Sequence, residues 1–277
     1  MSDIELSQKI EQLLVARNPR GMQTVSSALK PGYIMRAANM IKHNIGTVLI
    51  GTGFPVDSTF ETDGPVGAIA LYRAIEILGG KPILVCCDPL AEALKGDYNV
   101  HSLAMGSQSR ARLEAEQGLQ QFKPSLLIAI EHPGLTASND YRNMRGEDIS
   151  SRCSGFDFFL SMAQCPTIGI GDGGNEAGMG NIRNALTDLD IIASVIGCDE
   201  LVIADVSNWA AHGILAYLSY LEQKNLLQDW DNLQVLKYLS ARGSVDGVTR
   251  ENTLTEDGLE SAISESLIEQ LKKIIEF

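Results

Sequence analysis

The sequence predicts an α/β fold in three layers, in which a mostly parallel sheet is buried between helices on both of its faces. The first observation is a series of short runs rich in Val, Ile and Leu, which cover residues 47–51, 82–87, 125–131, 166–171 and 200–206. Such continuous apolar strands indicate a sheet that is covered on both faces. The second observation is that helical patterns separate these runs, which is typical of βαβ units and parallel strands.

The remaining elements follow from apolar spacing and from residues that begin or end helices. An amphipathic N-terminal helix, capped by Ser2 or Asp3, ends at the NPRG sequence of residues 18–21. We expect a further strand at 99–105 and, in chain order, helices at 67–80, 88–96, 109–122, 155–164, 208–223 and 260–277. Two glycines end the first of these helices. Asp88 is the expected cap of the second, with Pro89 in its first turn.

Composition sets limits on the class of protein. The chain has 277 residues, of which 44% are hydrophobic and 21% are charged, so it can bury a large core and is not disordered. No linker, repeat or low-complexity segment divides it. We therefore expect a single domain over residues 1–277, with the alternative that residues 1–20 are an appendage.

The charge balance and the cysteines limit the kinds of binding partner and the cellular compartment that we expect. Twenty-two basic against 35 acidic residues give a net charge of −13, which argues against nucleic acid and anionic membranes as partners. The chain has five cysteines and no C-x-x-C pair, so we expect free thiols. The polar start and the lack of a long apolar run predict no signal peptide and no membrane span. We therefore expect a cytoplasmic protein whose partner is a cation or a small anionic molecule bound with one.

Polar side chains gather where the predicted strands end. They lie in ETDGP after the first strand, EHPG after the third, GDGGNE after the fourth, VSNW after the fifth and VDGVT further on. In an open parallel sheet these carboxyl ends meet at one edge, and ligands bind there. The chemistry of the protein is therefore expected at this edge.

The segment from Gly169 to Gly174 has the pattern G-x-G-x-x-G, which also occurs in dinucleotide sites. Asp172 and Glu176 would repel a pyrophosphate there, so we expect no nucleotide cofactor. Hard oxygen donors favour Mg²⁺ or Mn²⁺, with Ca²⁺ as another candidate. The predicted metal ligands are Glu131, Asp172, Asn175 and Glu176. The alternative is that Asp172 and Asn175 cap a helix that follows.

Other residues near these loops are candidates for catalysis or substrate binding. The predicted catalytic residues are Glu61, Asp63, Arg145 and Asp246, and the predicted substrate-binding residues are Arg142, Asn143, Gly173, Gly174 and Asn208. The alternatives are structural. Asp63 could cap the helix that starts near Pro65, Asn208 could be a helix cap, and Asp246 could belong to an Asp-Gly turn. Either arginine could form a surface ion pair instead of gripping an anion.

The combination of ETDGP (61–65), EHPG with YRNMRG (141–146), GIGDGGNEAGMG (169–180), VSNW (206–209) and SVDGVT (244–249) resembles the D-glutamate cyclase-like C-terminal domain family, over about residues 45–250. The resemblance implies a lyase that converts D-glutamate to 5-oxo-D-proline with loss of water. In that hypothesis a metal ion on Asp172, Glu176 and Glu131 polarises the γ-carboxylate. Arg145 holds the α-carboxylate, and Glu61 or Asp63 is the base.

Two further functions remain open for the same acidic cluster. Relatives that consist of this domain alone imply a phosphatase dependent on Mn²⁺, in which the ion clamps a phosphoryl oxygen. A metal- or metabolite-binding protein without turnover is the third class. The exposed face of the C-terminal helix could support a homo-oligomer.

Overall fold

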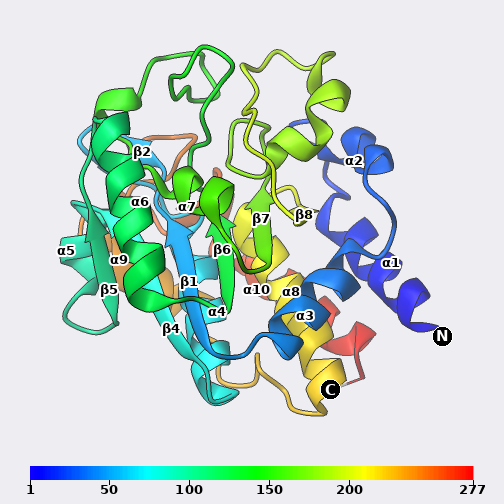
Figure 1. The fold of residues 1–277 in the computed structure, drawn as a ribbon. Helices are drawn as coiled ribbons and strands as arrows, with labels where there is room; N and C mark the ends of the chain where they lie inside the picture. Colours follow the sequence, from blue (N-terminus) through cyan, green and yellow to red (C-terminus); the bar gives the residue numbers. More distant parts are fainter. Residues whose placement is uncertain (277) are drawn as a thin grey trace.

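A computed structural model describes residues 1–276 and has a central sheet of six parallel strands (Figure 1). The strands are β1 (Thr47–Thr52), β4 (Lys81–Cys87), β5 (Val100–Leu103), β6 (Leu126–Ile130), β7 (Thr167–Gly171) and β8 (Glu200–Ile203). All six coincide with strands that the sequence predicts, and the predicted α/β class is confirmed.

The order of the strands fixes where the sheet opens. Along the sheet the order is β5-β4-β1-β6-β7-β8. The chain winds from β1 outward to β5, returns to place β6 beside β1, and then winds outward the other way. In register, Ile50 of β1 pairs with Leu84 on one side and Ile128 on the other. The two windings diverge between β1 and β6, and in such folds the crevice at this point takes ligands.

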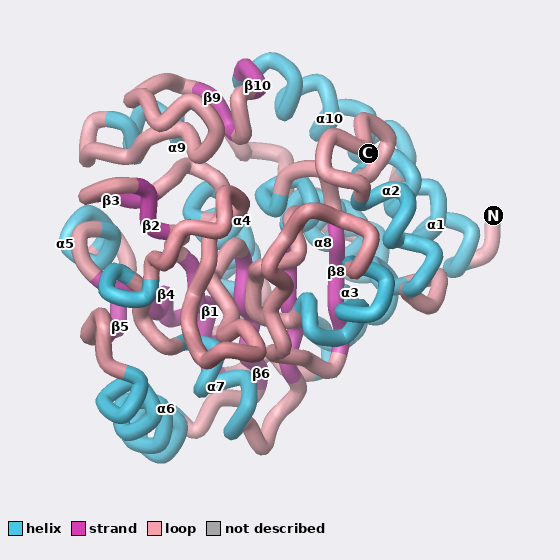
Figure 2. Tube along the Cα trace, turned by 90° about the horizontal axis from the view of Figure 1, so that it is seen from above, coloured by secondary structure: helices cyan, strands magenta, loops and turns pink. Residues whose placement is uncertain are grey.

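Helices cover both faces of the sheet, as the sequence predicts (Figure 2). One face carries α6 (Gln108–Phe122) and α7 (Phe156–Met162), and the other carries α3 (Tyr33–His43), α4 (Pro65–Ile77) and α8 (Ser207–Glu222). Successive strand residues face opposite layers. Leu49 therefore packs in the core with Phe156 and Phe159, whereas Val48 and Ile50 belong to the larger core on the α4 and α8 side.

The N-terminal helix α1 (Asp3–Leu14) is part of the larger core. Ser2 caps it, accepting a hydrogen bond from Glu5 N while the Glu5 carboxylate accepts one from Ser2 N. Ile10 and Leu14 are fully buried among α3, α8 and the C-terminal helix α10 (Ser261–Ile274). Residues 1–20 therefore pack with the rest of the molecule.

Several elements differ from the sequence prediction. Asp88 does not cap α5 (Leu90–Leu94), because that helix begins later and Pro89 is its N-cap residue. Helices α3 and α9 (Asn232–Ser240) were not predicted, nor was the short helix α2 (Met22–Val25). Two small hairpins were not predicted either: β2 (Pro55–Val56) with β3 (Thr59–Phe60), and β9 (Thr255–Glu256) with β10 (Leu259–Glu260).

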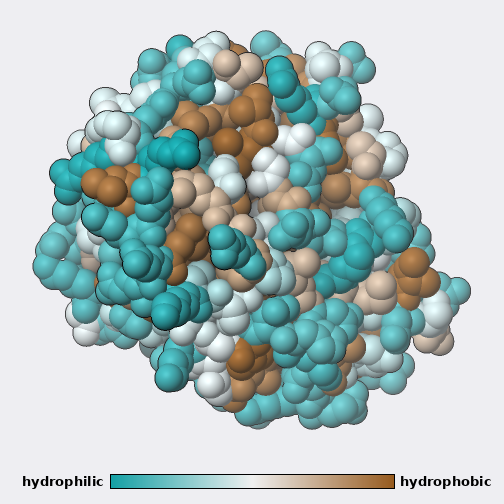
Figure 3. Space-filling view, viewed as in Figure 1, coloured by the Kyte–Doolittle hydropathy of each residue, from teal (hydrophilic) through white to brown (hydrophobic). Residues whose placement is uncertain are grey.

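Hydrophilic side chains predominate on the face drawn in Figure 3, where apolar side chains form separate patches. Among the helices of residues 1–276, none combines the length and the apolar character that crossing a membrane would require.

Candidate active site

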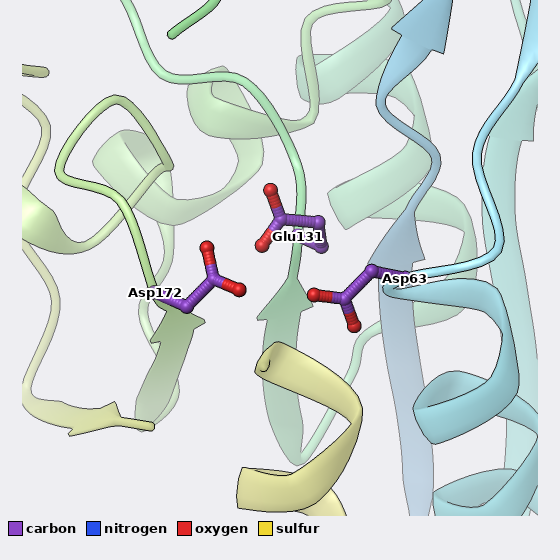
Figure 4. A group of neighbouring side chains, drawn as sticks. All are labelled: Asp63, Glu131 and Asp172. Atoms are coloured by element: carbon purple, nitrogen blue, oxygen red, sulfur yellow. The ribbon is translucent and has the colours of Figure 1, made fainter. Parts of the chain in front are cut away.

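Three buried carboxylates converge at the carboxyl edge of the sheet, where the two windings diverge (Figure 4). Asp63 lies between β3 and α4, Glu131 directly follows β6, and Asp172 directly follows β7. One oxygen from each carboxylate lies within 4.8 Å of the other two. The three side chains point toward a common space in Figure 4. The sequence places all three at strand ends, and the structure brings them together.

Asp63 is held by backbone amides at the start of α8. Its Oδ2 accepts a hydrogen bond from Ser207 N at 2.9 Å, and its Oδ1 accepts from Asn208 N at 2.8 Å and Gly64 N at 2.9 Å. A carboxylate is favoured there, because unpaired amides and the helix dipole make a helix N-terminus positive. Asp63 is therefore a helix cap, as the structural alternative predicts. The helix that it caps is α8, and not α4, which starts at Pro65.

Glu131 adopts a backbone conformation that is rare for a residue other than glycine, with φ of 42°. Its Oε2 accepts a hydrogen bond from Ser207 Oγ at 2.6 Å. Gly64 lies against it, and a Cβ atom at Gly64 would come within 2.7 Å of the Glu131 Cβ. Backbone strain of this kind persists where the surroundings fix it, and it is concentrated at functional sites.

Glu176 organises the loop that follows β7. Its carboxylate accepts hydrogen bonds from Gly173 N and Gly174 N, each at 2.8 Å, and from Asp172 N at 3.3 Å. Both oxygens are thus bonded to the backbone, and Glu176 shapes the loop that presents Asp172. The same bonds occupy the amides that would bind a pyrophosphate. Asp172 does not begin a helix, since the next helical stretch is a 3₁₀ segment starting at Met179.

A cavity of about 240 Å³ is lined by Glu131 and Asp172 of the three carboxylates, whereas Asp63 lies outside its wall. Asn175 lines it; the Asn175 Nδ2 donates to Arg142 O at 2.8 Å, whereas its buried Oδ1 has no partner within residues 1–276. A buried oxygen without a donor, on a residue that lines the same cavity as Glu131 and Asp172, is a group that a cation would satisfy. The donor set therefore fits a hard divalent cation.

Glu61 lines the same cavity and is buried. Its side chain accepts no hydrogen bond from the described part of the chain. Burial, followed by the negative charges of Asp257 and Asp63, raises the pKa of Glu61 well above its ordinary value. Burial also raises the pKa of Glu131 and of Asp172. The cavity floor therefore favours a bound cation or retained protons.

Sequence reasoning missed several charged residues of this cavity, above all Arg20 and Asp257, and also Arg152 and Arg250. Arg20 Nη2 lies 2.6 Å from Asp172 Oδ2 and also bonds the Asp257 carboxylate. Asp257 and Gly258, both with positive φ, form the two-residue turn between β9 and β10. Asp-Gly between two short strand patterns is a hairpin signal that could have indicated that turn. Arg20 has no local signal, because it is 152 residues from Asp172 in sequence.

Three further arginines line the cavity: Arg145, Arg152 and Arg250. Arg145 is exposed and donates a long hydrogen bond of 3.4 Å to Val248 O. Asn143 also lines the cavity, and its Oδ1 accepts from Arg145 N at 3.0 Å, which fixes the loop that carries the arginine. The cavity therefore combines an acidic floor with several guanidinium groups.

The structure does not bring Arg142, Gly173 or Gly174 into the wall of the cavity. The Arg142 guanidinium bonds Asp140, with Nε 2.9 Å from Oδ2, and donates to Gly146 O at 3.2 Å. Arg142 thus forms a surface ion pair, which is the structural alternative to a substrate-binding role. The two glycines lie in the loop behind Asp172, with their amides bonded to Glu176.

Asn208 and Asp246 are fully buried and lie outside the cavity wall. Asn208 Oδ1 accepts hydrogen bonds from backbone amides at the start of α4, so this residue acts as a helix cap. Asp246 accepts from Thr249 N at 2.8 Å and Gly258 N at 2.7 Å. It thereby joins its own loop to the β9–β10 hairpin, which carries Asp257.

These features define a doubly wound α/β protein with a carboxylate cluster at the point where its windings diverge. The chain matches the family described as "D-glutamate cyclase-like, C-terminal" over residues 10–272, and it belongs to that family. The resemblance seen in the sequence is thus confirmed, and it covers more of the chain than the motifs do.

Two known proteins are similar to this chain, one in sequence and one in structure. It is 30% identical over 251 residues to "D-glutamate cyclase, mitochondrial" of Homo sapiens, an alignment that covers 80% of this chain and 40% of that protein. The match thus spans less than half the length of the human relative. An exopolyphosphatase-related protein from Bacteroides fragilis superposes with a TM-score of 0.45 and 8% identity, covering 89% of this chain and 60% of that one.

Proposed function

We propose that this chain is a lyase that closes D-glutamate into the lactam 5-oxo-D-proline with loss of water. Membership of the family supports this reaction class, and the cavity supplies groups that it needs. The observation that carries the proposal is Glu61, a buried carboxylate that accepts no hydrogen bond from the described residues and faces a cavity lined by Arg145, Arg152 and Arg250.

The arginines account for binding of a dicarboxylate. Arg145 takes the α-carboxylate, because its guanidinium is exposed and only weakly bonded to the protein. Arg250 is already bonded to Glu147 Oε2 at 2.9 Å, so it contributes charge more than free donors. Holding the carboxylate and the amine at fixed positions favours the bent conformer in which the nitrogen meets the γ-carbon, and this lowers the entropic part of the barrier.

Glu61 is the group that moves protons in this proposal. It takes a proton from the substrate ammonium, and the neutral amine attacks the γ-carbon while a C–N bond forms. One C–O bond then breaks, and the oxygen leaves as water with the two protons that the nitrogen loses, one of them returned by Glu61. A raised pKa suits a carboxylate that both accepts and returns a proton near neutral pH. Asp63 is the weaker candidate for the base, because backbone amides occupy both of its oxygens.

The carboxylates of Asp63, Glu131 and Asp172, together with Asn175 Oδ1, would hold a divalent cation such as Mn²⁺ or Mg²⁺. When bound, the cation would neutralise the γ-carboxylate and make it a better electrophile. In this ligand set Asp63 takes the place that the sequence analysis gives to Glu176.

The test is incubation of the purified chain with D-glutamate and with L-glutamate, with added Mn²⁺ or with a chelator, followed by chromatography of the lactam. We expect lactam from D-glutamate only. Glu61→Gln and Asp172→Asn should each lower its rate of formation by about 10²-fold or more while the protein stays folded. Asp188→Asn removes the same charge at an exposed residue and should have no effect. Full turnover by Asp172→Asn, or no lactam from the wild type, contradicts the proposal.

A phosphatase is the second candidate, because three arginines around an acidic cluster also suit a phosphate group. It predicts hydrolysis of an aryl phosphate that requires Mn²⁺ and stops with a chelator. A binding protein without turnover predicts neither product, but a rise in the melting temperature with its ligand.

A further inference from the structure

Arg20 reaches the carboxylate cluster from a segment that is distant in sequence. The segment leaves α1 and is fixed at the carboxyl edge by Asp205, whose Oδ2 accepts hydrogen bonds from Arg17 N at 2.7 Å and Asn18 N at 3.2 Å. Because the backbone is anchored two residues before Arg20, the guanidinium has a defined position.

Arg20 donates a hydrogen bond to Asp172, one of the candidate metal ligands. Its Nη2 donates to Asp172 Oδ2 at 2.6 Å, to the Asp257 carboxylate, and to Asp205 O at 3.1 Å. The other nitrogens, Nε and Nη1, donate no hydrogen bond to residues 1–276, and Nε is buried. If Asp172 turned to another cation, Nη2 would keep two of its three acceptors, so Arg20 can give up this contact and still remain bonded.

The charge around Arg20 explains why it lies there. Asp63, Glu131 and Asp257 lie near Asp172, so several carboxylates share a buried space. The other cavity arginines bond elsewhere, Arg145 to Val248 O and Arg250 to Asp57 and Glu147. Arg152 bonds Asp57 O. Of the arginines that line this cavity, Arg20 is thus the one bonded to a carboxylate of the cluster, that of Asp172.

We propose that Arg20 is the internal counter-ion of the cluster and competes with a divalent cation for Asp172. It occupies Asp172 Oδ2 while no such cation is bound, and gives up this contact when one binds. The proposal rests on the metal site of the proposed function. The segment after α1 belongs to none of the catalytic motifs. In this proposal it nevertheless sets how tightly the cation is held.

The test is titration of chelator-treated, dialysed protein with MnCl₂, with bound ion measured by calorimetry and free Mn²⁺ by paramagnetic resonance. Arg20→Gln removes the competing charge and should tighten Mn²⁺ binding by about tenfold or more. Arg17→Gln removes the same charge from an exposed residue on the same segment and should leave the affinity near that of the wild type. Arg20→Lys keeps the charge but not the planar fork, so its affinity should lie between those of the wild type and Arg20→Gln.

Thermal unfolding supplies a second measurement. Without metal, Arg20→Gln should melt at a lower temperature than the wild type, and Mn²⁺ should raise its melting temperature more than that of the wild type. A variant that folds only with Mn²⁺ supports the proposal in the same way, because the ion replaces the missing counter-ion. If Arg20→Gln does not fold at all, the Mn²⁺ affinity of Arg20→Lys decides, and a value at or below that of the wild type overturns the proposal.

The possible failures are distinguishable. Equal or weaker Mn²⁺ binding by Arg20→Gln overturns the role of Arg20 and leaves the metal site standing. No Mn²⁺ binding by the wild type or by any variant overturns the metal site itself, and the role of Arg20 with it. Lactam formation is measured separately and is not needed for either conclusion.

Discussion

Asp63 and Asn208 cap each other's helices. Asp63 precedes α4 but accepts hydrogen bonds from Ser207 N and Asn208 N at the start of α8. Asn208 lies in α8, and its Oδ1 accepts from Gly64 N at 2.9 Å and Gly67 N at 2.7 Å at the start of α4. The helices α4 and α8, which pack against each other, are therefore joined at their N-termini, and these bonds fix the position of the Asp63 carboxylate.

Asn208→Ala should destabilise the protein by about 2–4 kcal/mol. The change removes the cap of α4 and also leaves the buried Glu256 carboxylate without the donor Asn208 Nδ2, which lies 2.8 Å away. Urea unfolding of the variant and of Asn184→Ala, an exposed asparagine, measures the effect. The control should change stability by less than about 0.5 kcal/mol. A similarly small loss in Asn208→Ala would show that the cap formed by Asn208 is not needed for stability.

The strands and the strand-end carboxylates could be predicted because their signals are local. A run such as 125–131 indicates a buried strand by itself, and Glu131 follows from its place at the end of that strand. Parallel strands then bring such ends to one edge. Glu131 and Asp172 could be anticipated on this basis alone.

The partners of those residues could not be predicted in the same way. Which helix Asp63 caps depends on the packing of α4 against α8, and nothing local to ETDGP records it. Arg20 and Asp257 are bonded across 237 residues of sequence, so their encounter is a property of the fold. Glu176 was predicted as a metal ligand from its residue type, whereas the tight turn after β7 directs its oxygens to backbone amides.

Gly247→Ala tests whether the position of the Glu61 carboxylate matters for the proposed reaction. A Cβ atom at residue 247 would lie 1.9 Å from Glu61 Oε2, so the carboxylate must move. The carboxylate is the far end of a flexible side chain and accepts no hydrogen bond from residues 1–276, so the cost in stability should be small. We expect kcat for lactam formation to fall about 10²-fold with the melting temperature nearly unchanged. The control is Gly96→Ala, because a Cβ atom at residue 96 would meet no other atom. Gly79→Ala is unsuitable because the φ of Gly79 is positive.

Arg145→Gln and Arg142→Gln distinguish the two arginines of the YRNMRG loop. Arg145 lines the cavity, so its loss should raise KM for D-glutamate about tenfold or more, with a smaller effect on kcat. Arg142 lies outside the cavity wall and bonds Asp140, so its loss should affect KM little. Steady-state kinetics of the two variants gives the comparison. A larger rise in KM for Arg142→Gln would assign the anion grip to the other arginine.

His212→Leu should reduce the sensitivity of the fold to acid. His212 is fully buried in α8 near the Trp230 ring, and neither ring nitrogen has a partner within residues 1–276. Burial lowers the pKa of His212 from 6.5 to about 3. The pKa of His212 is lower in the folded protein than in the unfolded chain. The fold therefore has its full stability above pH 6.5, where the imidazole is neutral in both states, and loses stability as the pH falls toward 3. At pH 5 the loss is about 2 kcal/mol.

The measurement is the free energy of unfolding in urea, for the wild type and for His212→Leu, at pH 8 and at pH 5. Every other titrating group contributes equally to both proteins, so the change in their difference between the two pH values reports His212 alone. Stability of the variant relative to the wild type should rise by about 2 kcal/mol on going from pH 8 to pH 5. A difference that does not change with pH would show that the buried imidazole binds its proton as readily in the folded state as in the unfolded one.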